Sequence, residues 1–146
     1  MIAWALSSGT KSIILSIKEG TTLELSRTKN FQPRPEQQEA INKTSEYFKN
    51  YQSQEGRTPH FLWNCKMRFG KTYTTYKLAQ QMGWNKILVL TFKPAVENSW
   101  RDDLYSHVDF EGWQFMSRGN TPYDEIDKTK PFVCFASFQD FLGKND

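Results

Sequence analysis

The sequence predicts an α/β fold in which helices flank a mostly parallel β-sheet. Apolar runs typical of buried strands alternate along the chain with amphipathic helical patterns, and this alternation gives parallel strands joined by helical crossovers. One of these runs leads through a short loop to Gly70-Lys71-Thr72, where the next helical pattern begins. The backbone amides at such a helix start point toward bound phosphate groups. The order of strand, loop, helix and strand therefore predicts a phosphate-binding α/β unit.

Length and composition are those of a soluble protein with one hydrophobic core. The chain has 146 residues, of which 38% are hydrophobic, and no apolar run approaches the length of a bilayer crossing. The first residues lack the pattern of a secretory signal, so we expect a cytoplasmic protein. The net charge of +3 permits a nucleic-acid partner without requiring one. Cys65 and Cys134 lack metal-ligand spacing and are expected to be reduced thiols.

Residues 1–30 are predicted to form a β-hairpin that either extends the domain or ends a preceding one. Two β-prone runs, residues 12–17 and 21–26, are separated by a short loop that contains Gly20. We find no residue pattern for chemistry in this hairpin.

The first helix is predicted to begin at Pro35, because proline is favoured at the first helical position. Apolar and aromatic residues then repeat at helical spacing as far as Tyr51. Residues 52–59 are polar and contain Gly56, which indicates a loop. The apolar run of residues 60–64 is predicted to be the strand that leads into the phosphate-binding loop.

Two further helices and three further strands are predicted after this loop. One helix runs from Lys71 to a left-handed cap near Gly83, and another begins at Pro94 with apolar residues at every fourth position as far as Val108. The segment of residues 118–130 is charged and broken by glycine and proline. The predicted strands are residues 86–92, 113–116 and 131–136.

The loop before Lys71 matches the phosphate-binding pattern Gly-x-x-x-x-Gly-Lys-Ser/Thr except at its first position, where this chain has Cys65. In such a loop, the ammonium group of Lys71 binds the β- and γ-phosphates, and the hydroxyl group of Thr72 binds Mg²⁺. A chance occurrence of Gly-Lys-Thr in a surface turn is the alternative, and the flanking strands disfavour it.

Four segments, taken in order, resemble the first RecA-like motor domain of superfamily 2 helicases, especially the helicase or translocase subunits of type III and type I restriction enzymes. These segments are residues 34–37, 67–72, 88–94 and 135–139. The resemblance covers residues 31–142. It implies that residues 31–146 are the N-terminal part of an ATP-binding domain with a RecA-like, three-layer αβα architecture. It also implies ATP and Mg²⁺ as cofactors, and DNA and other restriction-system subunits as partners.

The resemblance also implies roles for individual residues. Gln37 is expected to read the adenine base, with Arg34 beside it. The nucleotide-binding loop, in which Lys71 is the catalytic residue, comprises Met67, Arg68, Phe69, Gly70, Lys71 and Thr72. Members of the family more often carry glycine where this chain has Arg68. Contacts with the DNA backbone are expected from Thr91, Lys93, Pro94, Ser137 and Gln139. Local sequence alone would make Ser137 a helix N-cap.

Hydrolysis of ATP also needs an acid that holds Mg²⁺ and a group that positions the attacking water. In this superfamily both tasks fall to an Asp-Glu-x-His/Asp motif at the end of an apolar strand. Residues 124–127 match that motif literally, but residues 119–123 cannot form a central strand, so we reject the match. We therefore expect the acid motif after Asp146, and we expect these 146 residues to bind nucleotide weakly without hydrolysing it.

Two other functions remain open from the sequence. A P-loop kinase of a small metabolite would have the same phosphate site, but the lid and arginine-rich stretch that it needs are not evident. A noncatalytic nucleic-acid-binding module would grip backbone phosphate with the loop and stack bases on aromatic side chains. Tryptophans at strand and helix positions are more typical of a core. His60 and His107 lack the partner residues of nucleophilic or metal chemistry.

Overall fold

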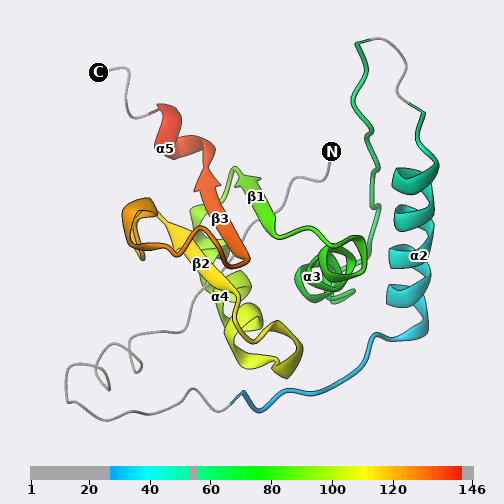
Figure 1. The fold of residues 1–146 in the computed structure, drawn as a ribbon, viewed down its shortest axis with the longest axis horizontal. Coiled ribbons are helices and arrows are strands. Elements are labelled where there is room, and N and C mark those ends of the chain that lie inside the picture. Colours follow the sequence, from blue (N-terminus) through cyan, green and yellow to red (C-terminus); the bar gives the residue numbers. More distant parts are fainter. Residues whose placement is uncertain (1–26, 53–55, 143–146) are drawn as a thin grey trace.

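The computed structural model describes residues 27–52 and 56–142, which form a mixed α/β fold around a small parallel sheet (Figure 1). Its three strands are β1 (Lys86–Thr91), β2 (Gln114–Ser117) and β3 (Phe132–Ser137). β3 lies in the middle and pairs in parallel with both neighbours, so the strand order is β1-β3-β2. The α/β fold with parallel strands that the sequence predicts is confirmed. The predicted N-terminal hairpin lies outside the described residues.

Helix α2 (Pro35–Asn50) begins at the predicted proline and packs on α3 (Lys71–Met82). Its buried residues recur about one helical turn apart and so share one face. They are Gln37, Ile41, Thr44 and Ser45. α3 has the predicted bounds because glycine sets both of its ends. Gly70 at the start and Gly83 at the end have φ values of 81° and 70°, in the left-handed region that side chains disfavour.

The helix predicted from Pro94 begins as a 3-10 turn, η1 (Pro94–Val96), and continues as α4 (Glu97–Ser106). The predicted apolar face extends to Val108, two residues beyond the end of the helix at Ser106. His107 has an extended backbone that ends the helical phase, and the chain turns through η2 (Val108–Phe110). As a result, Val108 is 40% exposed, while Phe110 is fully buried.

Helices α3 and α4 cover one face of the sheet. The core between them combines aromatic rings of the helices with alternate residues of all three strands, as a half-buried sheet requires. The cluster consists of Tyr73, Tyr76, Ala79, Val89, Trp100, Leu104, Phe110, Trp113, Phe115, Val133 and Phe135. The hydroxyl group of Tyr76 donates a 3.0 Å hydrogen bond to the carbonyl of Trp100 and so links the two helices. Burial raises the pKa of Tyr76 well above its ordinary value.

His107 fastens the segment that leads into α2. Its ring is buried, and Nε2 lies 2.8 Å from the carbonyl oxygen of Phe31. The backbone N–H of Asp109 donates to Nδ1 over 3.1 Å, so the proton of the neutral imidazole belongs on Nε2. The hydroxyl group of Tyr73 donates to the same carbonyl of Phe31 over 3.1 Å. His107 is therefore a structural residue, which agrees with its lack of a catalytic pattern in the sequence.

Residues 60–64 do not form the predicted strand. They belong to no strand of the sheet, although their side chains alternate as in a strand. The inner side chains face α2, since the ring centroid of Phe61 lies 5.4 Å from that of Tyr47 and the indole N–H of Trp63 donates to the Thr44 hydroxyl over 2.7 Å. Leu62, on the other side, is 88% exposed. A strand needs hydrogen bonds to a neighbouring strand, and none of the described strands pairs with this segment.

Of the expected three-layer αβα architecture, residues 27–52 and 56–142 contain the sheet and one helical layer, formed by α3 and α4. α2 packs on α3, and the second face of β2 is covered by the segment between β2 and β3. There, the side-chain amide of Gln114 exchanges hydrogen bonds of 2.8 and 3.0 Å with the backbone of Asp127. On β1, Leu88 is 57% exposed and lines a groove of about 440 Å³ between the strand and the segment around Pro59.

No helix in the described part of the chain is long and apolar enough to span a membrane.

Candidate nucleotide-binding site

The start of α3 presents unpaired backbone donors. Gly70 is the N-cap residue and has no side chain that could accept a hydrogen bond from the first turn. The N–H groups of Lys71, Thr72 and Tyr73 find no acceptor among the described residues. The helix dipole adds partial positive charge at the same place, which favours an anion. This end of α3 is therefore suited to hold a phosphate group.

Two side chains of the α2 start hold the loop that precedes Gly70. The amide Nε2 of Gln37 donates to the carbonyl oxygen of Phe69 over 2.8 Å, and the Nη2 of Arg34 donates to the same oxygen over 2.7 Å. Arg34 Nη2 also lies 3.1 Å from the carbonyl oxygen of Arg68. The amide Oε1 of Gln37 accepts the backbone N–H of Arg34 over 2.8 Å. We call these contacts the Gln37 latch.

Gly70 fits the Gln37 latch because it has no Cβ. A Cβ atom at position 70 would lie 2.6 Å from the Nε2 of Gln37, well inside van der Waals contact. The left-handed backbone at φ 81° adds a second reason for glycine. The predicted adenine reader and the predicted phosphate loop are thus brought together, because Gln37 is only 4% exposed and its amide is turned toward the loop.

Among the described residues other than glycine, Arg68 alone has a positive φ, which is 63°. This conformation costs a residue with a Cβ about 1–2 kcal/mol. Members of the resembling family more often carry glycine here, and the backbone of this chain keeps the shape that glycine would favour. The backbone at position 68 therefore has a conformation that glycine adopts readily, in a loop where this chain has arginine.

Lys71 and Thr72 lie half-buried on the first turn of α3. Lys71 forms no ion pair with any residue in the described ranges, so its charge is available to a ligand. Cys65 stands where the loop pattern has its first glycine. Burial raises the pKa of the Cys65 thiol against the opposing effect of the Lys71 charge, so the thiol remains protonated near neutral pH.

A cavity of about 580 Å³ opens between α2 and the loop. The N-cap residue Arg34 and charged side chains of α2, including Glu39 and Lys43, line one wall, and residues 61–69 line the other. Lys71 and Thr72 do not line it. The cavity therefore lies beside the loop and does not include the start of α3.

The predicted DNA-contacting residues gather at the carboxyl ends of β1 and β3. Thr91 and Ser137 are the last residue pair in the register of these strands. Lys93, Pro94 and Gln139 follow them and are exposed. Among the described residues, no hydrogen bond or ion pair joins this group to the loop before α3, so the structure shows two separate groups.

Ser137 is the N-cap of α5 (Phe138–Leu142), as its local sequence indicates. Its backbone N–H and hydroxyl donate to the carboxylate of Asp140 over 3.0 and 2.9 Å, and the Asp140 N–H returns a 3.3 Å bond to the hydroxyl. These bonds, the backbone one foremost, lower the pKa of Asp140. Ser137 is also buried, so its hydroxyl is engaged within the turn.

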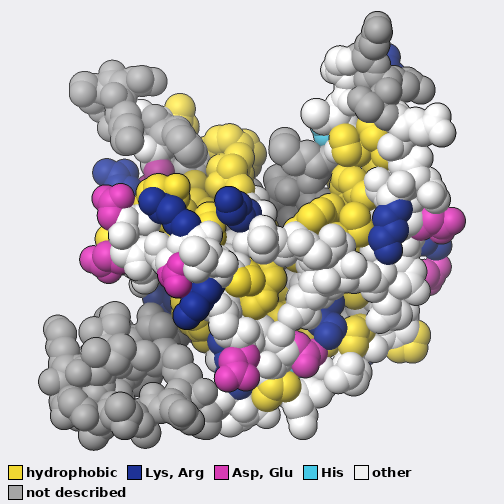
Figure 2. Space-filling model, viewed as in Figure 1, with side chains coloured by type: hydrophobic (Ala, Val, Ile, Leu, Met, Phe, Trp, Pro, Cys, Tyr) yellow, Lys and Arg dark blue, Asp and Glu magenta, His cyan; other side chains and the backbone are white. Residues whose placement is uncertain are grey.

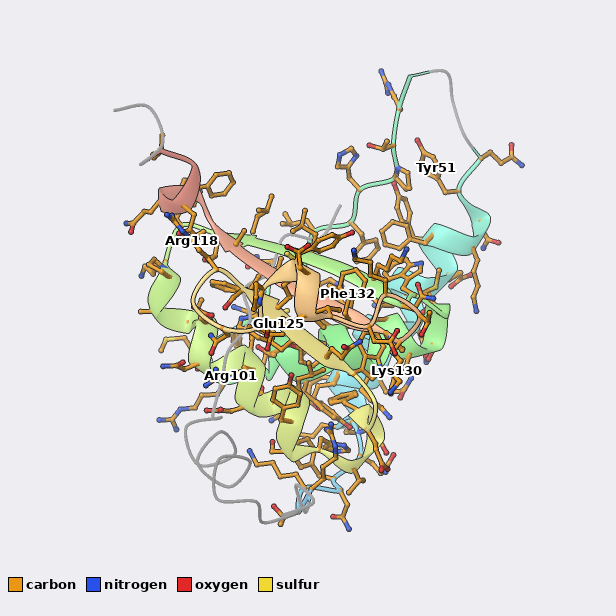
Figure 3. All side chains as sticks on the ribbon, turned by 60° about the vertical axis from the view of Figure 1, so that its left-hand side comes forward. Tyr51, Arg101, Arg118, Glu125, Lys130 and Phe132 are labelled. Carbon is orange, nitrogen blue, oxygen red and sulfur yellow. The ribbon has the colours of Figure 1, made fainter. Side chains whose placement is uncertain are left out.

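The rejected acid match is confirmed to lie outside a strand. Tyr123–Glu125 form a 3-10 turn, η3, and these residues are exposed. Figure 3 labels Glu125 on this turn. Within the described ranges, no cluster of three His, Cys, Asp or Glu side chains could hold a metal ion. The described residues therefore bring no carboxylate cluster to Thr72. The sequence could not indicate that the backbone carbonyls of Arg68 and Phe69 take part in the site, because every residue has such a group.

The model of the family described as type III restriction enzyme, res subunit, matches residues 30–145 of this chain. A protein of Mycoplasma pneumoniae described as the C-terminus of a type II restriction enzyme and methyltransferase is 41% identical over 117 residues. The aligned part is 78% of this chain and 16% of that relative, so the chain corresponds to a small part of it. No solved structure matches the chain significantly.

Proposed function

Because this chain belongs to the type III restriction enzyme res-subunit family, we propose that it is the nucleotide-binding part of an ATP-driven DNA helicase or translocase. The motor would serve a restriction endonuclease. The chain spans only 16% of its Mycoplasma relative. We therefore assign the motor activity to the assembled protein, and we assign nucleotide binding to this part of it.

The observation that carries the proposal is the uncapped start of α3. Three N–H groups that have no acceptor among the described residues lie at one place with the Lys71 ammonium and a glycine at the N-cap. A compact triphosphate tail supplies many acceptor oxygens and strong negative charge, which satisfy these donors together. Lys71 would be the catalytic cation that stabilises charge on the transferred phosphoryl group.

Mg²⁺ fits this site as an ion that arrives with the nucleotide. It commonly keeps several water ligands and uses few protein groups together with phosphate oxygens, and the hydroxyl group of Thr72 is of that kind. When bound, the ion would neutralise part of the phosphate charge. Since the described residues offer no carboxylate cluster, we propose that the acid needed for hydrolysis comes from elsewhere in the assembled protein.

The second group of residues is proposed to contact the DNA backbone. Lys93 and Gln139 are exposed at the carboxyl ends of adjacent parallel strands, where an ammonium and an amide can reach phosphate oxygens. Thr91 and Pro94 shape the corner, since the backbone N–H of Lys93 donates to the Thr91 hydroxyl over 3.1 Å. Ser137, engaged by Asp140, would position Gln139 within the same turn.

Calorimetric titration of residues 1–146 with a slowly hydrolysed ATP analogue and Mg²⁺ tests this function. We expect saturable binding at one site per chain and no steady release of phosphate from ATP itself. A titration without heat, confirmed by the absence of a thermal shift, would overturn the proposal. Steady turnover would show instead that the acid lies within the chain.

Substitution of Gln37 by alanine separates two roles of this residue. In the arrangement described, its amide supports the loop, so we expect the affinities for ATP and GTP to fall together, by about 3- to 10-fold. A residue that reads adenine would instead lower ATP affinity alone. Competition of both nucleotides against a fluorescent analogue measures the difference.

Gln38 offers a matched control for this experiment. It is the next residue on α2, and its amide bonds to Asn42 on the same helix over 2.9 Å rather than to the loop. Gln38→Ala is expected to leave both affinities unchanged. Equal losses in the two variants would contradict the latch role of Gln37.

A further inference from the structure

Two aromatic rings lie stacked and exposed beyond the carboxyl ends of β1 and β3. Phe92 is 76% exposed and Phe138 is 36% exposed. Their ring centroids are 4.5 Å apart, and the planes differ by 27°. One face of Phe92 is covered by Phe138, so the large exposed area includes its outer face. We call this pair the Phe92 platform.

The strand register builds the platform. Thr91 and Ser137 are the last paired residues of the two neighbouring strands, so the next residue of each strand projects from the same edge of the sheet. Figure 1 shows both strands ending on one side, where α5 leaves β3. The two rings therefore lie side by side because of the sheet, and the platform does not depend on a long flexible loop.

Cationic side chains flank the platform. Lys93 follows Phe92 directly and is exposed, and it forms no ion pair with a described residue. Arg118, which Figure 3 places beside α5, has a side chain that is 72% exposed and lies 3.6 Å from Asp140. The carboxylate of Asp140 is shared between Arg118 and the Ser137 cap. Figure 2 shows hydrophobic and basic side chains close together at this end of the molecule.

We propose that the Phe92 platform stacks an unpaired base of single-stranded DNA while Lys93 and Arg118 contact its backbone. The inference rests on the proposed function, and it adds contact with a base to contacts with phosphate. Aromatic faces combined with basic side chains suit single strands, because every base has a π-face and every nucleotide has a phosphate. A protein partner is less suited, since a two-ring patch flanked by exposed cations offers little apolar area.

The test compares a labelled 20-nucleotide oligo(dT) with an abasic chain of the same length. Wild-type protein is expected to bind oligo(dT) about tenfold more tightly than the abasic chain, which has the phosphates but no base to stack. Phe92→Ala is expected to lose this preference while keeping its affinity for the abasic chain. Phe92→Leu should behave like Phe92→Ala, because it is apolar without a ring, and Phe92→Tyr should retain the preference. Fluorescence anisotropy at several salt concentrations measures all of these.

Leu88→Ala is the matched control, because Leu88 is also exposed and apolar but lies within β1, away from the platform. It should bind both probes as the wild type does. An unchanged preference in Phe92→Ala would overturn the platform, as would equal binding of both probes by the wild type. Wild-type protein that binds neither probe would overturn the platform together with the DNA part of the proposed function. Normal ATP binding beside equal probe binding would leave the proposed function standing.

Discussion

Alanine at position 70 is expected to destabilise the protein by about 2–4 kcal/mol and to abolish nucleotide binding, because two independent costs add at this residue. The left-handed backbone at φ 81° disfavours any Cβ. That Cβ would also lie 2.6 Å from the Nε2 of Gln37, so the Gln37 latch must open or the loop must move. Either movement displaces the N–H groups that are proposed to bind phosphate. Chemical denaturation and calorimetry with an ATP analogue measure the two effects.

Gly83→Ala separates the two costs. Gly83 caps the other end of α3 with a similar φ of 70°, but nothing lies within 4 Å of its added Cβ. We expect Gly83→Ala to lower the free energy of unfolding by only the backbone cost, about 1–2 kcal/mol, and to bind nucleotide normally when folded. Combining Gly70→Ala with Gln37→Ala should recover the part of the loss that comes from the collision. Equal destabilisation by Gly70→Ala and Gly83→Ala would contradict the latch geometry.

Lys71→Ala is expected to weaken binding of an ATP analogue by about 10- to 100-fold without lowering the stability of the protein. The ammonium group has no partner among the described residues, so its removal breaks no ion pair within the folded chain. Its proposed interaction is with phosphate, where charge-assisted hydrogen bonds are strong. Calorimetry gives the affinity, and the melting temperature without ligand gives the stability.

Lys77 provides the opposite case on the same helix. Its ammonium group lies 2.7 Å from the carboxylate of Asp109, and both side chains are less than one third exposed. Lys77→Ala should therefore lower stability by about 1 kcal/mol and leave nucleotide affinity unchanged. If Lys71→Ala destabilised the protein while Lys77→Ala reduced affinity, the placement of the phosphate site at the start of α3 would be wrong.

Sequence reasoning succeeded where a local feature decides the structure. The bounds of α3 follow from Gly70 and Gly83, and the start of α2 follows from Pro35, because caps act within one turn of the helix. Residues 60–64 show the limit. Their alternation is real, but a strand exists only when a neighbouring strand supplies hydrogen-bond partners, and that is a property of the fold.

The site shows the same division. The predicted residues Arg34, Gln37 and Gly70 do lie together. The atoms that join them are backbone carbonyl oxygens, however, and these cannot be predicted from residue type. The Phe92 platform also could not be predicted from the sequence, since two phenylalanines 46 positions apart become neighbours only through the register of β1 and β3. The prediction that Val108 lies on the apolar face of the helix was wrong for a local reason. The helix ends at Ser106, before the apolar repeat in the sequence ends.

The outer side of β1 has a consequence for how this protein behaves in isolation. Among the described strands, β1 is bonded only to β3, so no described strand pairs with the backbone groups on its other side. Such an edge is a template for intermolecular pairing, and the exposed Leu88 beside it adds apolar surface. At high concentration, the isolated chain should therefore tend to oligomerise through β1, and a charged residue in place of Leu88 should oppose that tendency.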